Sequence, residues 1–76
     1  MNNGGNLLVG GTTVTLTSAT DFPESGSIRI GSEDITYSGK NVNQLTGLGR
    51  GANGTTPAEH TDGSTVTNIS DYVGWG

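Results

Sequence analysis

The side chains Glu59, His60 and Asp62 place three potential metal ligands within four positions. Protein zinc sites usually collect their ligands from separated segments and hold them with further hydrogen-bonding residues. The acids Glu33 and Asp34 could add ligands, but no supporting set of residues is evident. We therefore expect no metal ion and no cofactor, and we predict that His60 uses its ring nitrogens to hold a long loop to the backbone.

Two further patterns resemble catalytic or nucleotide-binding motifs. Residues 49–54 match the glycine spacing GxGxxG, but that motif must open a helix inside a βαβ unit, and Thr55-Thr56-Pro57 follows it here. Catalysis by a Ser or Thr nucleophile would need a base held by a third group. The sequence has one His and no Gly-x-Ser-x-Gly elbow, so we expect no enzyme.

Arg50 lies between two glycines in a chain that has only three basic residues. Its planar fork could bind the carboxylate of Glu33 or Asp34 at two points and so fix the long loop to a preceding hairpin. If exposed, the same side chain would contact a partner. We favour the internal pair.

Composition limits the chain to one small domain. Only 29% of its 76 residues are hydrophobic, while 14 are glycine, which disfavours helices and is typical of short strands joined by tight turns. Such a composition also occurs in disordered segments, but the apolar residues here recur with a regular period. The small core and the absence of cysteine lead us to expect stabilisation by neighbours, through self-association or docking on a larger assembly.

Charge and hydropathy argue against two classes of partner. The formal net charge is −4, and three scattered basic residues make no basic stripe, so we expect no nucleic-acid binding. No segment approaches the roughly 20 apolar residues of a membrane span, and the N-terminus lacks the pattern of a signal peptide. We therefore expect no membrane partner and a protein made in the cytoplasm.

Alternation of apolar and polar residues predicts the strands. Residues 13–17 send Val14 and Leu16 to one face, and residues 27–30 and 33–37 form a hairpin around Gly31-Ser32. In that hairpin Ile28, Ile30, Ile35 and Tyr37 face inward. Residues 38–41 are predicted to turn the chain, residues 43–48 to form a third strand and residues 64–69 to close the sheet.

Residues 49–63 are predicted to form a long Gly-rich loop, in which residues 57–60 could wind into one helical turn capped by Thr56. The predicted fold is all-β: a single small antiparallel barrel or sandwich of about five short strands, with this loop and extended terminal arms.

We divide the chain into an N-terminal arm at residues 1–11, a compact domain at residues 12–69 and an aromatic arm at residues 70–76. An apolar triplet in a polar terminus, or large aromatic side chains near one, suits an interface, although a flexible leader is the alternative for residues 1–11. The residues predicted to contact partners are Leu7, Leu8, Val9, Tyr72, Val73 and Trp75.

An ordered set of residues across two-thirds of the chain resembles a small module of tailed-bacteriophage virion proteins. The set comprises Phe22-Pro23, Gly26, Ile28, Ile30, Gly31, Glu33, Ile35, Tyr37, Leu45, Arg50-Gly51, Thr55, His60, Gly63 and Val66. The resemblance implies that Glu33, Arg50, Thr55 and His60 are framework residues rather than catalytic ones. Because this chain is little more than the module, a small accessory subunit is favoured over a large fibre or tail spike.

This resemblance implies a structural protein located in the virion. We expect a head decoration, cement or head-fibre subunit that self-associates and adheres to capsid or tail proteins in many copies. The alternative is a tail or baseplate subunit that recognises a host glycan, with Tyr72 or Trp75 stacking on a sugar ring.

Overall fold

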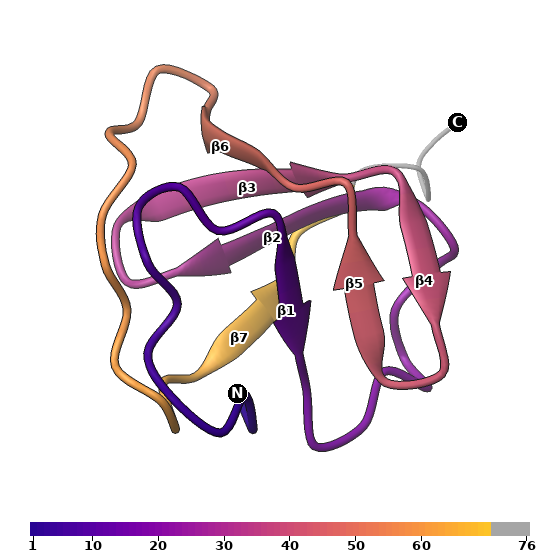
Figure 1. Cartoon of the computed structure of the whole chain (residues 1–76). Helices are drawn as coiled ribbons and strands as arrows, with labels where there is room; N and C mark the ends of the chain where they lie inside the picture. The colour runs from indigo at the N-terminus through magenta and orange to yellow at the C-terminus, as the bar shows by residue number, and fades with distance from the viewer. Residues whose placement is uncertain (71–76) are drawn as a thin grey trace.

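The computed structural model describes residues 1–70, in which seven short strands form two antiparallel sheets (Figure 1). The three-stranded sheet has the order β1-β5-β4, and the four-stranded sheet has the order β6-β3-β2-β7. The two sheets do not join into a closed barrel. The strands are β1 (Thr13–Thr15), β2 (Gly26–Ile30), β3 (Glu33–Tyr37), β4 (Gly39–Asn41), β5 (Gln44–Thr46), β6 (Gly49–Ala52) and β7 (Val66–Asn68).

The β2–β3 hairpin is the centre of the larger sheet, and it confirms the pattern of alternation. Ile30 pairs with Glu33, which leaves a two-residue loop, and Gly31 takes a φ of 61° in it. Glycine adopts this left-handed conformation without steric cost. Ile28 and Ile35 face each other across the strands and are fully buried, whereas Arg29 between the inward-facing isoleucines is exposed.

The core lies between the inner faces of the two sheets. Each aliphatic side chain buried there stabilises the fold by roughly 1.5–3 kcal/mol. The three-stranded sheet contributes Val14 and Leu45, which pair with each other in the β1–β5 register. The remaining buried hydrophobic residues are Leu7, Leu16, Ala19, Ile28, Ile30, Ile35, Tyr37 and Leu48, with Met1, Phe22 and Val66 packed against them.

The structure has more strands than the five that we predicted. Residues 39–41, expected to turn the chain, form β4, and residues 49–52, expected in the long loop, form β6 on the edge beside β3. Both strands lack apolar alternation because they are rich in glycine and polar residues. A Cβ at Gly49 would lie 2.4 Å from Oγ1 of Thr36 on β3, so any other residue here would have to displace that side chain.

The helical turn that we considered for residues 57–60 is absent. His60 instead pairs with Leu7 as an isolated antiparallel bridge, with backbone N···O distances of 2.8 Å in both directions. The backbone N–H of Ala58 donates to the side chain of Glu33. The N–H groups of Ala58 and His60 therefore donate to other segments of the chain and not to carbonyls within a helical turn.

Residues 1–11, which we expected to extend as an arm, lie against the domain (Figure 1). Leu7 is only 2% exposed, and the Met1 ammonium donates to the carbonyl of Ser64 at 2.7 Å. The predicted arm at residues 70–76 falls almost entirely outside the described residues. Within residues 1–70 there is no helix that is long and apolar enough to cross a membrane.

Candidate functional site

The carboxylate of Glu33 is the centre of a buried polar cluster at the start of β3. The residue is 1% exposed, yet its two oxygens accept five hydrogen bonds. Two come from Arg50, one from His60 and two from the backbone N–H groups of Gly51 and Ala58. Burying a charge costs several kcal/mol unless it is paired and hydrogen-bonded, and this carboxylate meets both conditions.

Arg50, on β6, binds Glu33 with its fork. Its Nε lies 2.8 Å from Oε2, and its Nη2 lies 2.9 Å from Oε1. The other N–H groups donate to the carbonyls of Leu8, Gly11 and Ala58. The five N–H donors of a guanidinium therefore all have acceptors. The sequence left Glu33 and Asp34 open as partners, and the structure shows the internal pair with Glu33.

His60 joins the cluster from the segment that follows β6. Its Nε2 lies 2.6 Å from Oε1 of Glu33. Because an ionised carboxylate only accepts hydrogen bonds, the Nε2–H group of His60 is the donor in this hydrogen bond. The backbone of the same residue is bonded to Leu7. We predicted that the ring nitrogens of His60 bond to the backbone; in the structure Nε2 bonds to the side chain of Glu33, and it is the backbone of His60 that bonds to Leu7.

The electrostatics of the cluster keep Glu33 ionised. Burial in itself raises the pKa of this carboxyl, but hydrogen bonds from Arg50, His60 and two backbone N–H groups outweigh it. The net effect lowers the pKa of Glu33 from 4.5 to about 2. The carboxylate of Glu33 is therefore ionised at neutral pH and is paired there with the cation of Arg50.

A second cluster surrounds the neighbouring carboxylate, Asp34. Arg29, opposite it in the hairpin, donates from Nε to Oδ1 at 2.7 Å, and Asn53 donates to Oδ2 at 3.0 Å. The hydroxyl of Thr55 accepts from the backbone N–H of Asp34 at 2.9 Å and donates to the carbonyl of Ala52 at 2.7 Å. The hydrogen bond from Arg29 is the main cause that lowers the pKa of Asp34.

The three potential metal ligands of the sequence do not converge. Glu59 accepts from the side chain of Asn6, and Asp62 accepts from the backbone N–H of Asn3, so both acids fasten the N-terminal segment to the loop. Residues 1–70 hold no group of three His, Cys, Asp or Glu residues that could bind a metal ion. The side chains that could do chemistry are instead engaged in connecting segments.

The residues predicted to contact partners divide into three groups. Leu7 is 2% exposed and belongs to the hydrophobic core, so within residues 1–70 its side chain is not available to a partner. Leu8 and Val9 are 60% and 52% exposed. Tyr72, Val73 and Trp75 lie outside the described residues.

Some site residues were missed by our reading of the sequence. Asn53 takes a φ of 55° at the turn after β6 and bonds to Asp34, and Lys40 donates to the carbonyls of Ala19 and Phe22. The Arg29–Asp34 pair could have been found, because the predicted hairpin register places these residues opposite each other. No sequence signal marked the Lys40 contacts.

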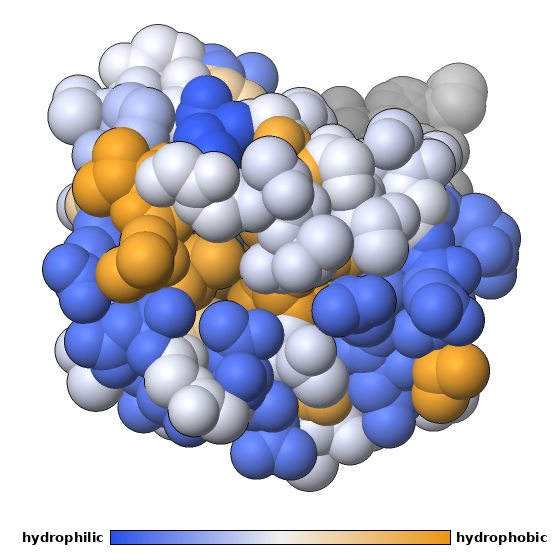
Figure 2. Space-filling model, viewed as in Figure 1, coloured by the Kyte–Doolittle hydropathy of each residue, from blue (hydrophilic) through white to orange (hydrophobic). Residues whose placement is uncertain are grey.

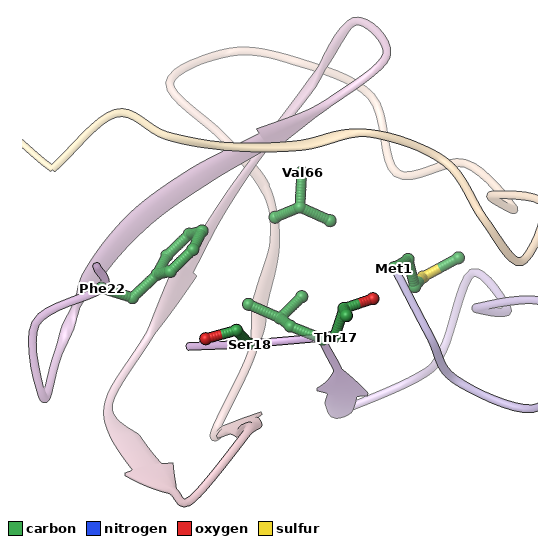
Figure 3. A pocket seen from close by; sticks show the side chains of 6 residues that line it. Met1, Thr17, Ser18, Phe22 and Val66 are labelled. Atoms are coloured by element: carbon green, nitrogen blue, oxygen red, sulfur yellow. The ribbon is translucent and has the colours of Figure 1, made fainter. Parts of the chain in front are cut away.

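A shallow hollow of about 180 Å³ opens between the segment after β1 and strand β7 (Figure 3). Its apolar lining comes from Met1, Leu16, Phe22 and Val66, and Thr17 and Ser18 add hydroxyl groups. It is separate from the Glu33 cluster, since none of these residues bonds to that carboxylate.

Comparisons of the chain with protein-family models, with curated proteins and with solved structures found no match.

Proposed function

We propose that this chain is a small structural subunit of a tailed-bacteriophage virion, either a head decoration, a cement or a head-fibre protein. One observation carries the proposal. Glu33, Arg50 and His60, which belong to the set resembling the virion module, meet in one buried cluster that connects β3, β6, the following loop and the N-terminal segment. A framework that fixes loops without disulfides suits a subunit whose role is mechanical.

The cluster also supports an adhesive mechanism. Arg50 binds the carbonyls of Leu8 and Gly11, and the backbone N–H of Gly11 donates to the carbonyl of Leu8 at 2.9 Å. The intervening turn is thus held in one shape with the side chains of Leu8 and Val9 exposed. A preorganised apolar contact loses less conformational entropy on binding than a flexible one.

The surface around this turn is apolar, as a contact with a partner protein requires. Figure 2 shows apolar surface gathered on the side where the N-terminal segment and the β2–β3 turn lie, with polar surface below it. Leu8 and Val9 are two of the three large hydrophobic residues that are exposed among residues 1–70. We therefore assign Leu8 and Val9 as the contact with the capsid or tail subunit.

Cryo-electron microscopy of particles from the source phage tests the proposal. We expect regular density of this size over the capsid lattice. Density confined to the tail would replace the head assignment with the tail or baseplate alternative, and particles without such density would overturn the virion role.

An add-back experiment tests the contact itself. Particles that lack the subunit are incubated with purified wild-type chain, with the double variant Leu8→Ser/Val9→Ser, or with Thr65→Ser as an exposed control. We expect the wild type and the control to sediment with the particles and the double variant to stay in the supernatant. Equal incorporation of all three would exclude Leu8 and Val9 as the contact.

A further inference from the structure

Two asparagines of the chain are followed by glycine, in Asn3-Gly4 and Asn53-Gly54, and this dipeptide can rearrange without an enzyme. The backbone nitrogen of the glycine attacks the side-chain Cγ of the asparagine and closes a succinimide ring, and the NH₂ group leaves with the amide proton as ammonia. Water then opens the ring, giving an OH to the acyl carbon and a proton to the nitrogen. Opening at the main-chain carbonyl yields isoaspartate. Glycine favours the reaction because it has no Cβ to hinder the attack.

The structure gives the two asparagine side chains opposite hydrogen bonds. At Asn3, the backbone N–H of Thr15 donates to Oδ1 at 3.0 Å. At Asn53, Nδ2 donates to Oδ2 of Asp34 at 3.0 Å. A backbone N–H only donates and an ionised carboxylate only accepts, so these partners determine which atom of each carboxamide is the oxygen and which is the nitrogen.

These hydrogen bonds affect the attack on Cγ in opposite senses. Negative charge develops on Oδ1 as the nitrogen adds, and a positioned N–H donor stabilises such a charge, as Thr15 is placed to do for Asn3. The hydrogen bond from Arg29 lowers the pKa of Asp34, so that side chain is ionised at neutral pH. At Asn53 it therefore holds the NH₂ group that has to leave and has no proton to give it.

The backbone that follows Asn3 is open. Within residues 1–70, no hydrogen bond engages the carbonyl of Asn3 or the backbone groups of Gly4 and Gly5. A Cβ at either glycine would meet no atom within 4 Å. The chain can therefore rotate after Asn3 to bring the nitrogen of Gly4 to Cγ.

The backbone around Asn53 is closed by a hydrogen bond. Asn53 and Gly54 have φ values of 55° and 80°, and the N–H of Thr55 donates to the carbonyl of Ala52 at 3.0 Å. Positive φ at both central residues is the type I′ turn, in which Asn-Gly is preferred. Rotation after Asn53 toward the reactive geometry would break this hydrogen bond.

We propose that Asn3 converts spontaneously to isoaspartate in the folded chain, whereas Asn53 is protected by Asp34 and by its closed turn. The product has an extra carbon in the main chain and a new carboxylate. Both arise beside Asp62, whose Oδ1 accepts from the backbone N–H of Asn3 at 2.7 Å. Repulsion between the two carboxylates should loosen residues 1–6. This inference does not depend on the virion role.

Peptide mapping measures both reactions in one sample. Trypsin cleaves after Arg29, Lys40 and Arg50, so Asn3 and Asn53 fall on different peptides. The wild-type chain is incubated in mildly alkaline buffer, either folded or in urea, and tandem mass spectrometry locates isoaspartate over time. In the folded chain we expect Asn3 to convert at least about tenfold faster than Asn53, and in urea we expect similar rates.

The comparison with urea separates the effect of the fold from that of the shared dipeptide. Similar rates at the two sites of the folded chain, or a ratio that urea leaves unchanged, would overturn the inference. An Asn3 that converts more slowly in the folded chain than in urea would exclude activation by the N–H of Thr15.

The effect on the N-terminal segment is measured on the aged chain itself. Anion exchange isolates the more acidic product, and we expect it to melt at a lower temperature than the fresh wild type. Asn3→Gln is the matched control, because its longer side chain keeps the carboxamide but closes the corresponding ring far more slowly. Its melting temperature should not change during the same incubation. An isolated product that melts like the fresh wild type would contradict the loosening of residues 1–6.

Discussion

The carboxylate of Glu33 and the guanidinium of Arg50 form a two-point ion pair whose side chains are 1% and 9% exposed. The pair connects the central hairpin to an edge strand, and Arg50 extends the connection to the carbonyls of Leu8 and Gly11. A single buried charge pair thus positions segments that are far apart in the sequence.

Removing Arg50 should destabilise the fold strongly. In Arg50→Met the carboxylate of Glu33 stays buried without its cation, and breaking a buried pair in this way costs about 3–5 kcal/mol. The measurement is the free energy of unfolding in urea at pH 7.

Arg29→Met is the matched control for that measurement. It breaks the other arginine–carboxylate pair of the hairpin. Because the Arg29 side chain is 53% exposed and Asp34 keeps the hydrogen bond from Asn53, we expect a smaller loss of stability than in Arg50→Met. Equal losses of unfolding free energy in the two variants would mean that burial does not determine how much the Glu33–Arg50 pair contributes to stability.

The lowered pKa of Glu33 predicts that the free energy of unfolding decreases at acidic pH. The pKa is about 2 in the folded chain against an ordinary value of 4.5, so the unfolded state binds more protons between these values. Stability from this group is therefore complete above pH 4.5 and is lost as the pH falls toward 2. The loss amounts to about 3 kcal/mol. Urea unfolding at a series of pH values measures it.

Glu33→Gln provides the control for this loss at acidic pH. Its side chain does not titrate, so we expect a chain that is less stable at pH 7 but whose stability falls less between pH 4.5 and 2. An unchanged slope in this variant would assign the loss at acidic pH to other carboxylates.

The hydroxyl of Thr55 should matter more than that of its neighbour. Thr55→Val leaves the buried N–H of Asp34 without its acceptor, which costs about 1–3 kcal/mol, whereas the carbonyl of Ala52 still accepts from the backbone N–H of residue 55. Thr56→Val changes an exposed residue and should stay within about 0.5 kcal/mol of wild type. Thermal unfolding of both variants in parallel decides the matter, and a Thr55→Val chain as stable as Thr56→Val would contradict the role of this hydroxyl.

The sequence predicted the parts of the fold whose apolar residues alternate. The hairpin of Ile28, Ile30, Ile35 and Tyr37 has the expected faces, and the rarity of cations led to the internal pairing of Arg50. The strands β4 and β6 lack alternating apolar residues. They form by pairing with β5 and β3, and the local sequence does not indicate this pairing. The place of Leu7 depends on a backbone bridge to His60 near the other end of the chain, and no local pattern encodes such a contact.

The neighbouring leucines Leu7 and Leu8 give the sharpest test of whether residues 1–11 belong to the domain. Leu7→Ala removes a side chain buried in the core and should cost about 2–5 kcal/mol. Leu8→Ala alters an exposed side chain of the same type and should change the free energy of unfolding by no more than about 0.5 kcal/mol. Hydrogen exchange of the His60 amide, which donates to the carbonyl of Leu7, should accelerate in the first variant alone. If both variants instead unfolded like the wild type, residues 1–11 would behave as the free arm that their composition indicates, and the exposed turn at Leu8 and Val9 would lose the rigid support on which the adhesive mechanism depends.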